Sequence, residues 1–259
     1  MPNSDKTTLR LAKLFPSIVT LLGICSGVSA IRFALDEKWQ LAVTCVVIAT
    51  LLDAVDGKFA RALKATSKFG SNLDSLSDFI NFGFVPPLVI FLWSSFQVPK
   101  FGWASVLFFV VCCAIRLARF NSDIDAEDEK PAEWKIRFFK GVPSPAGALA
   151  ALAPMMIMFA VEDKFIQKYD YFEFLENPYF LIFYLAFIAI LMASRVPSYS
   201  LKKILIKKKF LSLFFIFIAG FIVSALIQPW LMIVFTGVVY YALLPISALH
   251  YLKLEKMNA

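Results

Sequence analysis

The chain has 259 residues, of which 59% are hydrophobic and 16% aromatic, and its formal net charge is +7. Its mean hydropathy is +0.72, whereas a soluble domain is only about 45–50% apolar, so the composition excludes an ordinary water-soluble protein. The sole histidine, His250, argues against a catalytic dyad or a metal site built on histidines. The cysteines lie in apolar stretches without zinc-site spacing, and we expect core thiols; they are Cys25, Cys45, Cys112 and Cys113.

Apolar stretches recur along the whole chain, each close to the roughly 20 residues that a bilayer-spanning helix needs. Backbone groups in hydrocarbon must pair internally, so each stretch predicts a helix, and the alternating pattern of a membrane β-barrel is absent. The sequence therefore predicts an all-α, polytopic integral membrane protein with about eight transmembrane helices. Because the connections are short, we expect a single domain over residues 1–259. The predicted helices are 15–35, 39–60, 74–96, 101–118, 143–161, 178–196, 210–227 and 230–250.

Lysine and arginine are concentrated in alternate connections between these helices. The segment from Arg116 to Lys140 holds six of them, and so does the segment from Arg195 to Lys209. Basic residues mark cytoplasmic connections, so both termini and the connection near residues 61–68 are predicted to face the cytoplasm. This sorting accounts for most of the net charge, which therefore gives no reason to expect nucleic-acid binding.

Four aspartates interrupt the second and third apolar stretches, in the sequence "DAVDGKFARALKATSKFGSNLDSLSD" at 53–78. Asp53 and Asp56 are spaced i, i+3 and Asp74 and Asp78 i, i+4, so each pair shares one helix face. A short connection over 63–69 would fold the two helices into a hairpin, with the pairs facing one cleft. Neighbouring carboxylates cannot all stay ionised without cations. Hard oxygen ligands suit Mg²⁺ or Mn²⁺, and two metal ions about 3.5–4 Å apart would fit the cluster.

The alternative is that these are ordinary carboxylates at helix ends, with Asp74 as a helix N-cap. That explanation does not cover Asp53 and Asp78, which stand several residues inside apolar stretches, where acidic residues are costly and usually functional. The pattern thus favours a cation-linked function, either catalysis or ion-coupled transport. A transporter predicts a second, inverted copy of the motif, and the sequence contains only one.

Small residues and one arginine accompany the aspartates. Close approach to the helix surface is possible at three residues with little or no side chain, Gly57, Ala60 and Gly70. Either a flat ligand or a neighbouring helix could use this space. Arg61 stands at the predicted cytoplasmic end of the second helix, where it serves either as a topology residue or as a partner for phosphate. Metal ions and a guanidinium converging on one place would suit a diphosphate.

The spacing of these residues, Asp53-x2-Asp56-Gly57-x2-Ala60-Arg61-x8-Gly70-x3-Asp74-x3-Asp78, resembles the signature of the CDP-alcohol phosphotransferases at every fixed position. The resemblance implies a membrane enzyme that transfers a phosphatidyl-type group from a CDP-linked lipid to an alcohol and releases CMP, assisted by two divalent cations. It implies that the metal ligands are Asp53, Asp56, Asp74 and Asp78, that Asp78 is also the general base, and that the CDP pocket is shaped by Gly57, Ala60, Arg61 and Gly70.

Stretches outside the signature resemble the phosphatidylserine synthase branch of that family. They are "FPSIVTLLGICSGVSAI" at 15–31, "LDSLSDFINFGFVPP" at 73–87, "AIRLARFN" at 114–121, "KGVPSPAGA" at 140–148 and "SRVPSYSLKK" at 194–203. Asn81 departs from the pattern, because a small residue such as serine is expected there. The resemblance covers most of residues 10–205, so the helices after about 205 look like a C-terminal extension.

This branch implies CDP-diacylglycerol and L-serine as substrates, in contact with membrane lipids. It further implies a homodimer in a bacterial-type inner (cytoplasmic) membrane, with the active site facing the cytoplasm. Arg116 and Arg119, spaced i, i+3, could hold the lipid-linked phosphate or the serine carboxylate, or could simply anchor a cytoplasmic helix end. The acceptor also stays open to choline, inositol phosphate or glycerol phosphate. The segment "PSP" at 143–145 either frees backbone groups at a wet cavity or merely starts a helix.

Overall fold

Helices dominate the computed structural model, which describes residues 4–62, 67–94, 97–125, 138–163, 165–166, 170–199 and 211–258. The described part of each of the eight apolar stretches is mainly helical, which confirms the all-α class. The helices are α1 (Ser4–Leu35), α2 (Trp39–Ala62), α3 (Lys68–Asp78), the π-helix η1 (Phe79–Phe84), α4 (Val85–Trp93), α5 (Pro99–Asp125), α6 (Ser144–Ala151), α7 (Ala153–Glu162), the 3-10 helix η4 (Asp170–Glu176), α8 (Pro178–Ala193), α9 (Leu211–Ile227) and α10 (Pro229–Asn258). Two short antiparallel strands, which the sequence did not predict, pair β1 (Phe138–Lys140) with β2 (Pro197–Tyr199).

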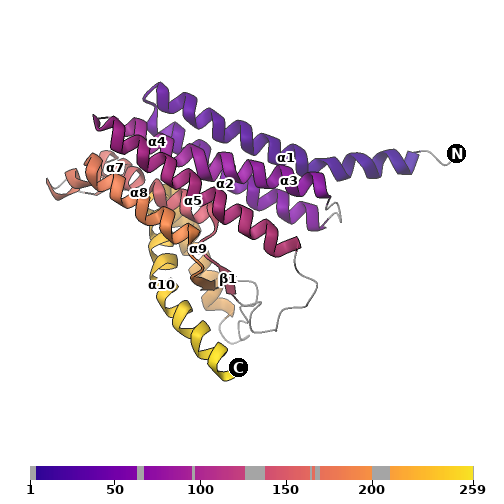
Figure 1. Cartoon of the computed structure of the whole chain (residues 1–259). Helices are drawn as coiled ribbons and strands as arrows, with labels where there is room; N and C mark the ends of the chain where they lie inside the picture. The colour runs from indigo at the N-terminus through magenta and orange to yellow at the C-terminus, as the bar shows by residue number, and fades with distance from the viewer. Residues whose placement is uncertain are drawn as a thin grey trace.

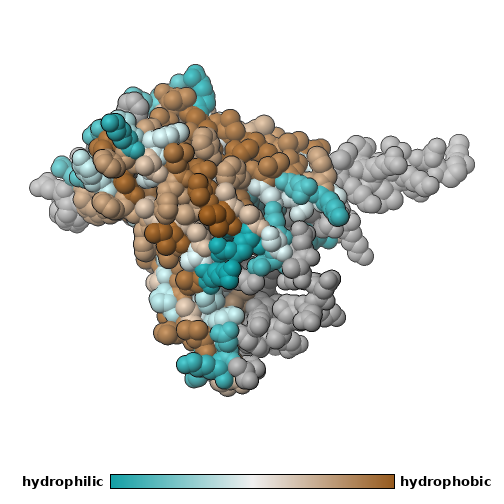
Figure 2. Space-filling model, in the orientation of Figure 1, coloured by the Kyte–Doolittle hydropathy of each residue, from teal (hydrophilic) through white to brown (hydrophobic). Residues whose placement is uncertain are grey.

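The helices have the length and surface of membrane-spanning segments. Within the described part of the chain, five helical stretches are long and apolar enough to cross a bilayer, and the bent pair of α6 and α7 would be a sixth; the five are Phe15–Leu35, Trp39–Phe59, Lys68–Trp93, Pro99–Asp123 and Pro229–Met257. Helix α8 and Phe215–Ile227 are apolar but shorter. Figure 2 shows hydrophobic side chains over most of the visible helix surface, with hydrophilic ones gathered in separate patches. The chain is therefore an integral membrane protein.

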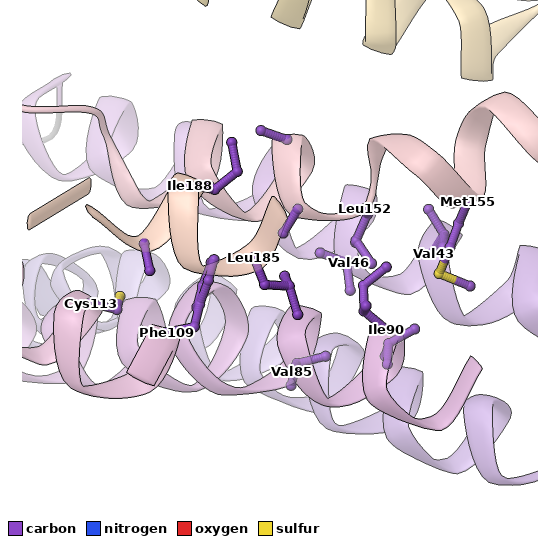
Figure 3. Packing of buried hydrophobic residues seen from close by; sticks show 14 of the residues in the cluster. Val43, Val46, Val85, Ile90, Phe109, Cys113, Leu152, Met155, Leu185 and Ile188 are labelled. Atoms are coloured by element: carbon purple, nitrogen blue, oxygen red, sulfur yellow. The ribbon is translucent and has the colours of Figure 1, made fainter. Parts of the chain in front are cut away.

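The helices enclose one apolar interior. Helix α1 packs along α2, and α5 packs against α8. Helix α10 runs at a steep angle to α1, α2 and α5 (Figure 1) and packs against α7 and α9. In Figure 3 the fully buried side chains of Val85, Phe109 and Leu185 lie in the space between α4, α5 and α8. The expectation of core thiols holds for Cys112 and Cys113, which are buried, and is wrong for Cys25, which is exposed.

The third predicted helix begins earlier than its apolar stretch and is not uniform. Ser67 caps it, since its hydroxyl accepts a hydrogen bond of 3.0 Å from the Gly70 amide. Asp74 therefore lies inside α3 and is not the N-cap that could have explained it. Immediately after Asp78 the helix widens into the π-helix η1, and such widened turns are frequent at functional sites. Of the predicted connection 63–69, residues 63–66 lie outside the described part of the chain.

Two further boundaries differ from prediction in ways that matter for the site. Helix α5 continues to Asp125, so Arg116 and Arg119 lie within a helix and not at its end. The predicted helix 143–161 is two helices bent by 44°. The bend follows Leu152, close to Pro154 in the first turn of α7, because proline cannot donate the backbone hydrogen bond that would continue the helix.

Asn81, the residue that departs from the family pattern, occupies space left by a glycine of α1. It is fully buried, and its side-chain nitrogen donates to the Ser77 hydroxyl at 3.1 Å. A Cβ on Gly27 would overlap Oδ1 of Asn81 and come within 2.9 Å of its Cγ. The large side chain of Asn81 on η1 thus fits against α1 because Gly27 has no side chain there, and the two residues form one close helix contact.

We expect Gly27→Ala to destabilise the protein by about 1–3 kcal/mol, the usual cost of overpacking. Alanine's better helix propensity, worth about 1 kcal/mol, offsets only part of this because Asn81 is held by Ser77. The measurement is thermal unfolding of the purified protein in detergent. Pairing Gly27→Ala with Asn81→Ser should restore the unfolding temperature, and a single variant as stable as wild type would contradict the close contact.

Candidate active site

Three of the four predicted aspartates meet in space. Asp53 and Asp56 of α2 and Asp74 of α3 each offer a carboxylate oxygen, and the three oxygens lie within 4.8 Å of one another. Asp56 is 3% exposed, Asp53 is half-buried and Asp74 is exposed, so the cluster reaches from the interior to the surface. The helical spacing makes this possible, because i, i+3 places the first two carboxylates on one face of α2.

Asp78 lies one turn beyond Asp74 on α3, outside that group of three. Its carboxyl group is within hydrogen-bonding reach of the Asp53 carboxyl group. Among the described residues, Oδ1 of Asp78 and Oδ1 of Asp56 are buried without a hydrogen-bond partner. Buried polar atoms are almost always paired, and adjacent carboxylates need a proton or a cation between them. The donor set of this cluster therefore fits a divalent cation.

A hydroxyl group from α1 holds one side of the cluster in place. Thr20 donates to Oδ2 of Asp56 at 2.6 Å, and the same hydroxyl lies 3.0 Å from the Pro16 carbonyl oxygen. One oxygen of Asp56 is thus oriented by Thr20 while the other stays available. Sequence reasoning missed Thr20, for which the available signal was a polar residue inside the apolar run "SIVTLLG".

The predicted CDP-pocket residues have different surroundings. A Cβ on Gly57 would meet only Nη1 of Arg61, at 3.7 Å, so the surface beside it is open. Arg61 is exposed in the last turn of α2, with Ala60 preceding it on the same helix. A Cβ on Gly70 would lie 3.2 Å from the Ser67 hydroxyl, so the glycine leaves room for the cap of α3. Gly57 therefore leaves space for an approaching ligand, while the nearest contact of Gly70 is with the cap of its own helix.

Arg116 and Arg119 both reach across from α5, to different elements. Arg116 donates through Nε to the Val142 carbonyl and through Nη1 to the Ser144 hydroxyl, so it satisfies the free carbonyl group before α6. The "PSP" segment is thus the start of a helix. Arg119 donates to the Ala193 carbonyl at 2.9 Å, at the end of α8.

Of the two arginines, Arg116 is the one that interacts electrostatically with a residue of the aspartate site. Its guanidinium is close enough to the Asp78 carboxyl group for their charges to interact. A guanidinium has five N–H groups, and the described residues engage only two of those on Arg116. Three N–H groups of Arg116 are therefore without a described partner. For Lys140, which lies in β1, the structure describes the backbone alone.

Comparison with known proteins places this geometry in context. Residues 13–193 match the family described as CDP-alcohol phosphatidyltransferase. The chain is 32% identical to a CDP-diacylglycerol–serine O-phosphatidyltransferase of Mycobacterium leprae over 221 residues, which are 85% of this chain and 70% of the relative. It is 31% identical to the protein of that name from Mycobacterium tuberculosis over 235 residues, 91% and 78% of the two chains, and 32% identical to the one from Helicobacter pylori over 206 residues, 80% of each.

Proposed function

Because the chain belongs to the CDP-alcohol phosphatidyltransferase family, we propose that it transfers the phosphatidyl group of CDP-diacylglycerol to the hydroxyl group of L-serine, with phosphatidylserine and CMP as products. The observation that carries the proposal is the convergence of Asp53, Asp56 and Asp74 next to Asp78, in a cluster that reaches from the interior of an apolar helix bundle to its surface. The relatives named as serine O-phosphatidyltransferases cover most of both chains, which favours serine as the acceptor.

Two divalent cations, Mg²⁺ or Mn²⁺, would be held by Asp53, Asp56, Asp74 and Asp78. When bound, they neutralise the negative charge of the diphosphate and of the departing CMP. The orphaned oxygens of Asp56 and Asp78 support this assignment, as does the preference of both ions for carboxylate ligands. Thr20 orients Asp56, which limits the cost of arranging the ligands when an ion binds.

The CDP group would lie over the open surface at Gly57, beside Ala60 and the exposed Arg61, in a pocket that extends toward Gly70. Arg61 supplies a positive charge for the diphosphate. The absence of a side chain at Gly57 lets the ligand approach the helix closely. The lipid tails would remain among the apolar helix surfaces that face the bilayer.

In the reaction, the serine hydroxyl oxygen attacks the phosphorus that carries diacylglycerol. The bond from this phosphorus to the bridging oxygen breaks, CMP departs with the electron pair, and the hydroxyl proton passes to Asp78. Arg116 would hold the anionic group of the acceptor, while Arg119, anchored at the end of α8, would contribute positive charge nearby. As in other phosphoryl transfers, the protein mainly positions groups and stabilises charge.

The membrane arrangement follows the same proposal. Eight spans with both termini in the cytoplasm would place the aspartate cluster at the cytoplasmic face of a bacterial-type inner membrane, where CDP-linked lipids and serine meet. The shorter helices α8 and α9 would then count as spans, supported by their apolar composition. The chain would form a single domain, with the helices after about residue 205 as a C-terminal extension, and would assemble as a homodimer.

The experiment that tests the function is CMP release by the purified protein in detergent. CDP-diacylglycerol and Mg²⁺ or Mn²⁺ are supplied, with serine, choline, inositol phosphate and glycerol phosphate tested in parallel. We expect release with serine alone and phosphatidylserine as the lipid product. Release with another acceptor would replace serine and keep the chemistry, whereas no release with any acceptor and no binding of CDP-diacylglycerol would overturn the enzyme assignment.

A further inference from the structure

Helix α10 brings a tyrosine hydroxyl near Arg116, the residue proposed to hold the acceptor. Helix α10 packs against β2 and α6, and it lies beyond residues 13–193, which match the family. Its Tyr240 is close enough to Arg116 for the phenol and the guanidinium to interact electrostatically. Arg116 in turn interacts with Asp78, so the guanidinium links Tyr240 to the proposed base.

We propose that Tyr240 binds the carboxylate of the acceptor amino acid beside Arg116, and that it thereby helps to select serine over acceptors without a carboxylate. This inference rests on the proposed function. The residues of the family signature handle the CDP group, which every acceptor of such chemistry shares. Discrimination among acceptors must therefore come from residues outside the signature, and Tyr240 is one of these.

The hydroxyl group of Tyr240 has the features of an unfilled binding group. It is buried and approaches the Ser198 hydroxyl, yet it makes no hydrogen bond of good geometry with any described residue. The Ser198 hydroxyl already donates to the Gly141 carbonyl, at 3.2 Å, so toward Tyr240 it can act only as an acceptor. A charged carboxylate is a stronger acceptor than a serine hydroxyl, and a bound one would take the Tyr240 proton from this imperfect contact.

The ring of Tyr240 explains how this hydroxyl is held. Tyr240 packs edge-on against Tyr241, with ring centroids 5.4 Å apart. It also lines a cavity of about 670 Å³ whose walls are mostly apolar, including Leu149, Ile188 and Ile233. The apolar ring is thus accommodated among apolar side chains, and its hydroxyl group is buried close to Ser198.

The chemistry of serine matches this arrangement. A carboxylate can accept from the free N–H groups of Arg116 and from the Tyr240 hydroxyl at the same time. Because Arg116 also interacts with Asp78, a carboxylate bound there leaves the serine hydroxyl, only a few bonds away, on the side of the proposed base. Choline has no carboxylate and would lose this anchor.

The test compares Tyr240→Phe with Tyr241→Phe. Tyr240→Phe removes only the hydroxyl, and we expect the KM for serine to rise about tenfold or more, as when a hydrogen bond to a charged ligand group is lost. The KM for CDP-diacylglycerol and the metal requirement should not change. Tyr241→Phe is the matched control, because its hydroxyl faces the Ala146 carbonyl at 3.5 Å, and its KM for serine should equal that of wild type.

A second acceptor separates recognition from folding. Serinol keeps the hydroxyl and amino groups of serine but lacks the carboxylate, and the ratio of kcat/KM for the two acceptors does not depend on the folded fraction. We expect Tyr240→Phe to lower the preference for serine over serinol by the same factor as it raises the KM. An unchanged preference in a serine-active enzyme would overturn this inference alone, whereas wild-type protein inactive with serine would overturn the proposed function first.

Discussion

Replacing Asp78 with asparagine should abolish serine-dependent CMP release while CDP-diacylglycerol still binds. Asparagine has nearly the same size but cannot accept a proton at neutral pH, and a general base contributes about 10²–10⁴-fold to a rate. Among the described residues Oδ1 of Asp78 is buried without a hydrogen-bond partner, and Arg116, the proposed holder of the acceptor, is near enough to interact with it, so Asp78 is the best placed base in the cluster. The measurement pairs initial rates of CMP release with equilibrium binding of the lipid substrate.

The control for this substitution is Asp163→Asn, at the exposed end of α7. It makes the same chemical change far along the chain from the signature, and its turnover should equal that of wild type. Full activity of Asp78→Asn would remove Asp78 from the role of base. Loss of lipid binding together with turnover would assign Asp78 a ligand-holding role alone.

The parts of the site that the sequence could predict are those set by local helix geometry. The spacing of Asp53 and Asp56 fixes them on one face of α2 whatever the tertiary structure, and a connection short enough for a hairpin brings Asp74 opposite them. The observed separation of their oxygens follows from these local facts. Apolar stretches predict helices in a membrane for an equally general reason, because hydrocarbon offers backbone groups no other partner.

Contacts between distant segments could not be predicted in this way. The hydrogen bond from Thr20 to Asp56 joins residues 36 positions apart, and periodicity in either helix does not encode the rotation of one against the other. Pairing of β1 with β2 likewise depends on where two loops meet. Tyr240 resembles any other tyrosine in an apolar helix until α10 is seen to pack against α6, whose residue Ser144 accepts a hydrogen bond from Arg116.

The predicted helix boundaries were wrong for a related physical reason. The hydropathy of residues 74–96 marks where the chain becomes apolar, but α3 begins at Lys68 because Ser67 caps it. Likewise α5 extends past its apolar part to Asp125. A helix ends where its backbone groups find other partners, and this need not coincide with the edge of the hydrocarbon.

Replacing Asp56 with asparagine should weaken metal dependence and lipid-substrate binding together. Asp56 is the most buried of the three clustered carboxylates, so water cannot readily take its place as a ligand. Loss of a hydrogen bond to a metal ligand typically lowers the metal affinity ~10–100-fold. Because Asp56→Asn changes the ligand itself, we expect the half-saturating concentration of Mg²⁺ or Mn²⁺ to rise by at least this factor. Metal titrations of CMP release, with binding of CDP-diacylglycerol measured in the absence and presence of the ion, provide the readout.

Thr20→Val tests whether the orientation of the Asp56 carboxylate, as distinct from its charge, matters for metal binding. Valine preserves the shape of threonine but cannot donate to Oδ2 of Asp56, so the metal titration should shift in the same direction as with Asp56→Asn, and by less. Thr44→Val is the matched control, because among the described residues Thr44 donates to the Gln40 carbonyl of its own helix and to no carboxylate, and its titration should be that of wild type. A metal titration that Asp56→Asn leaves unchanged would refute the ligand role, since a carboxylate that binds the ion cannot be neutralised without reducing the affinity for it.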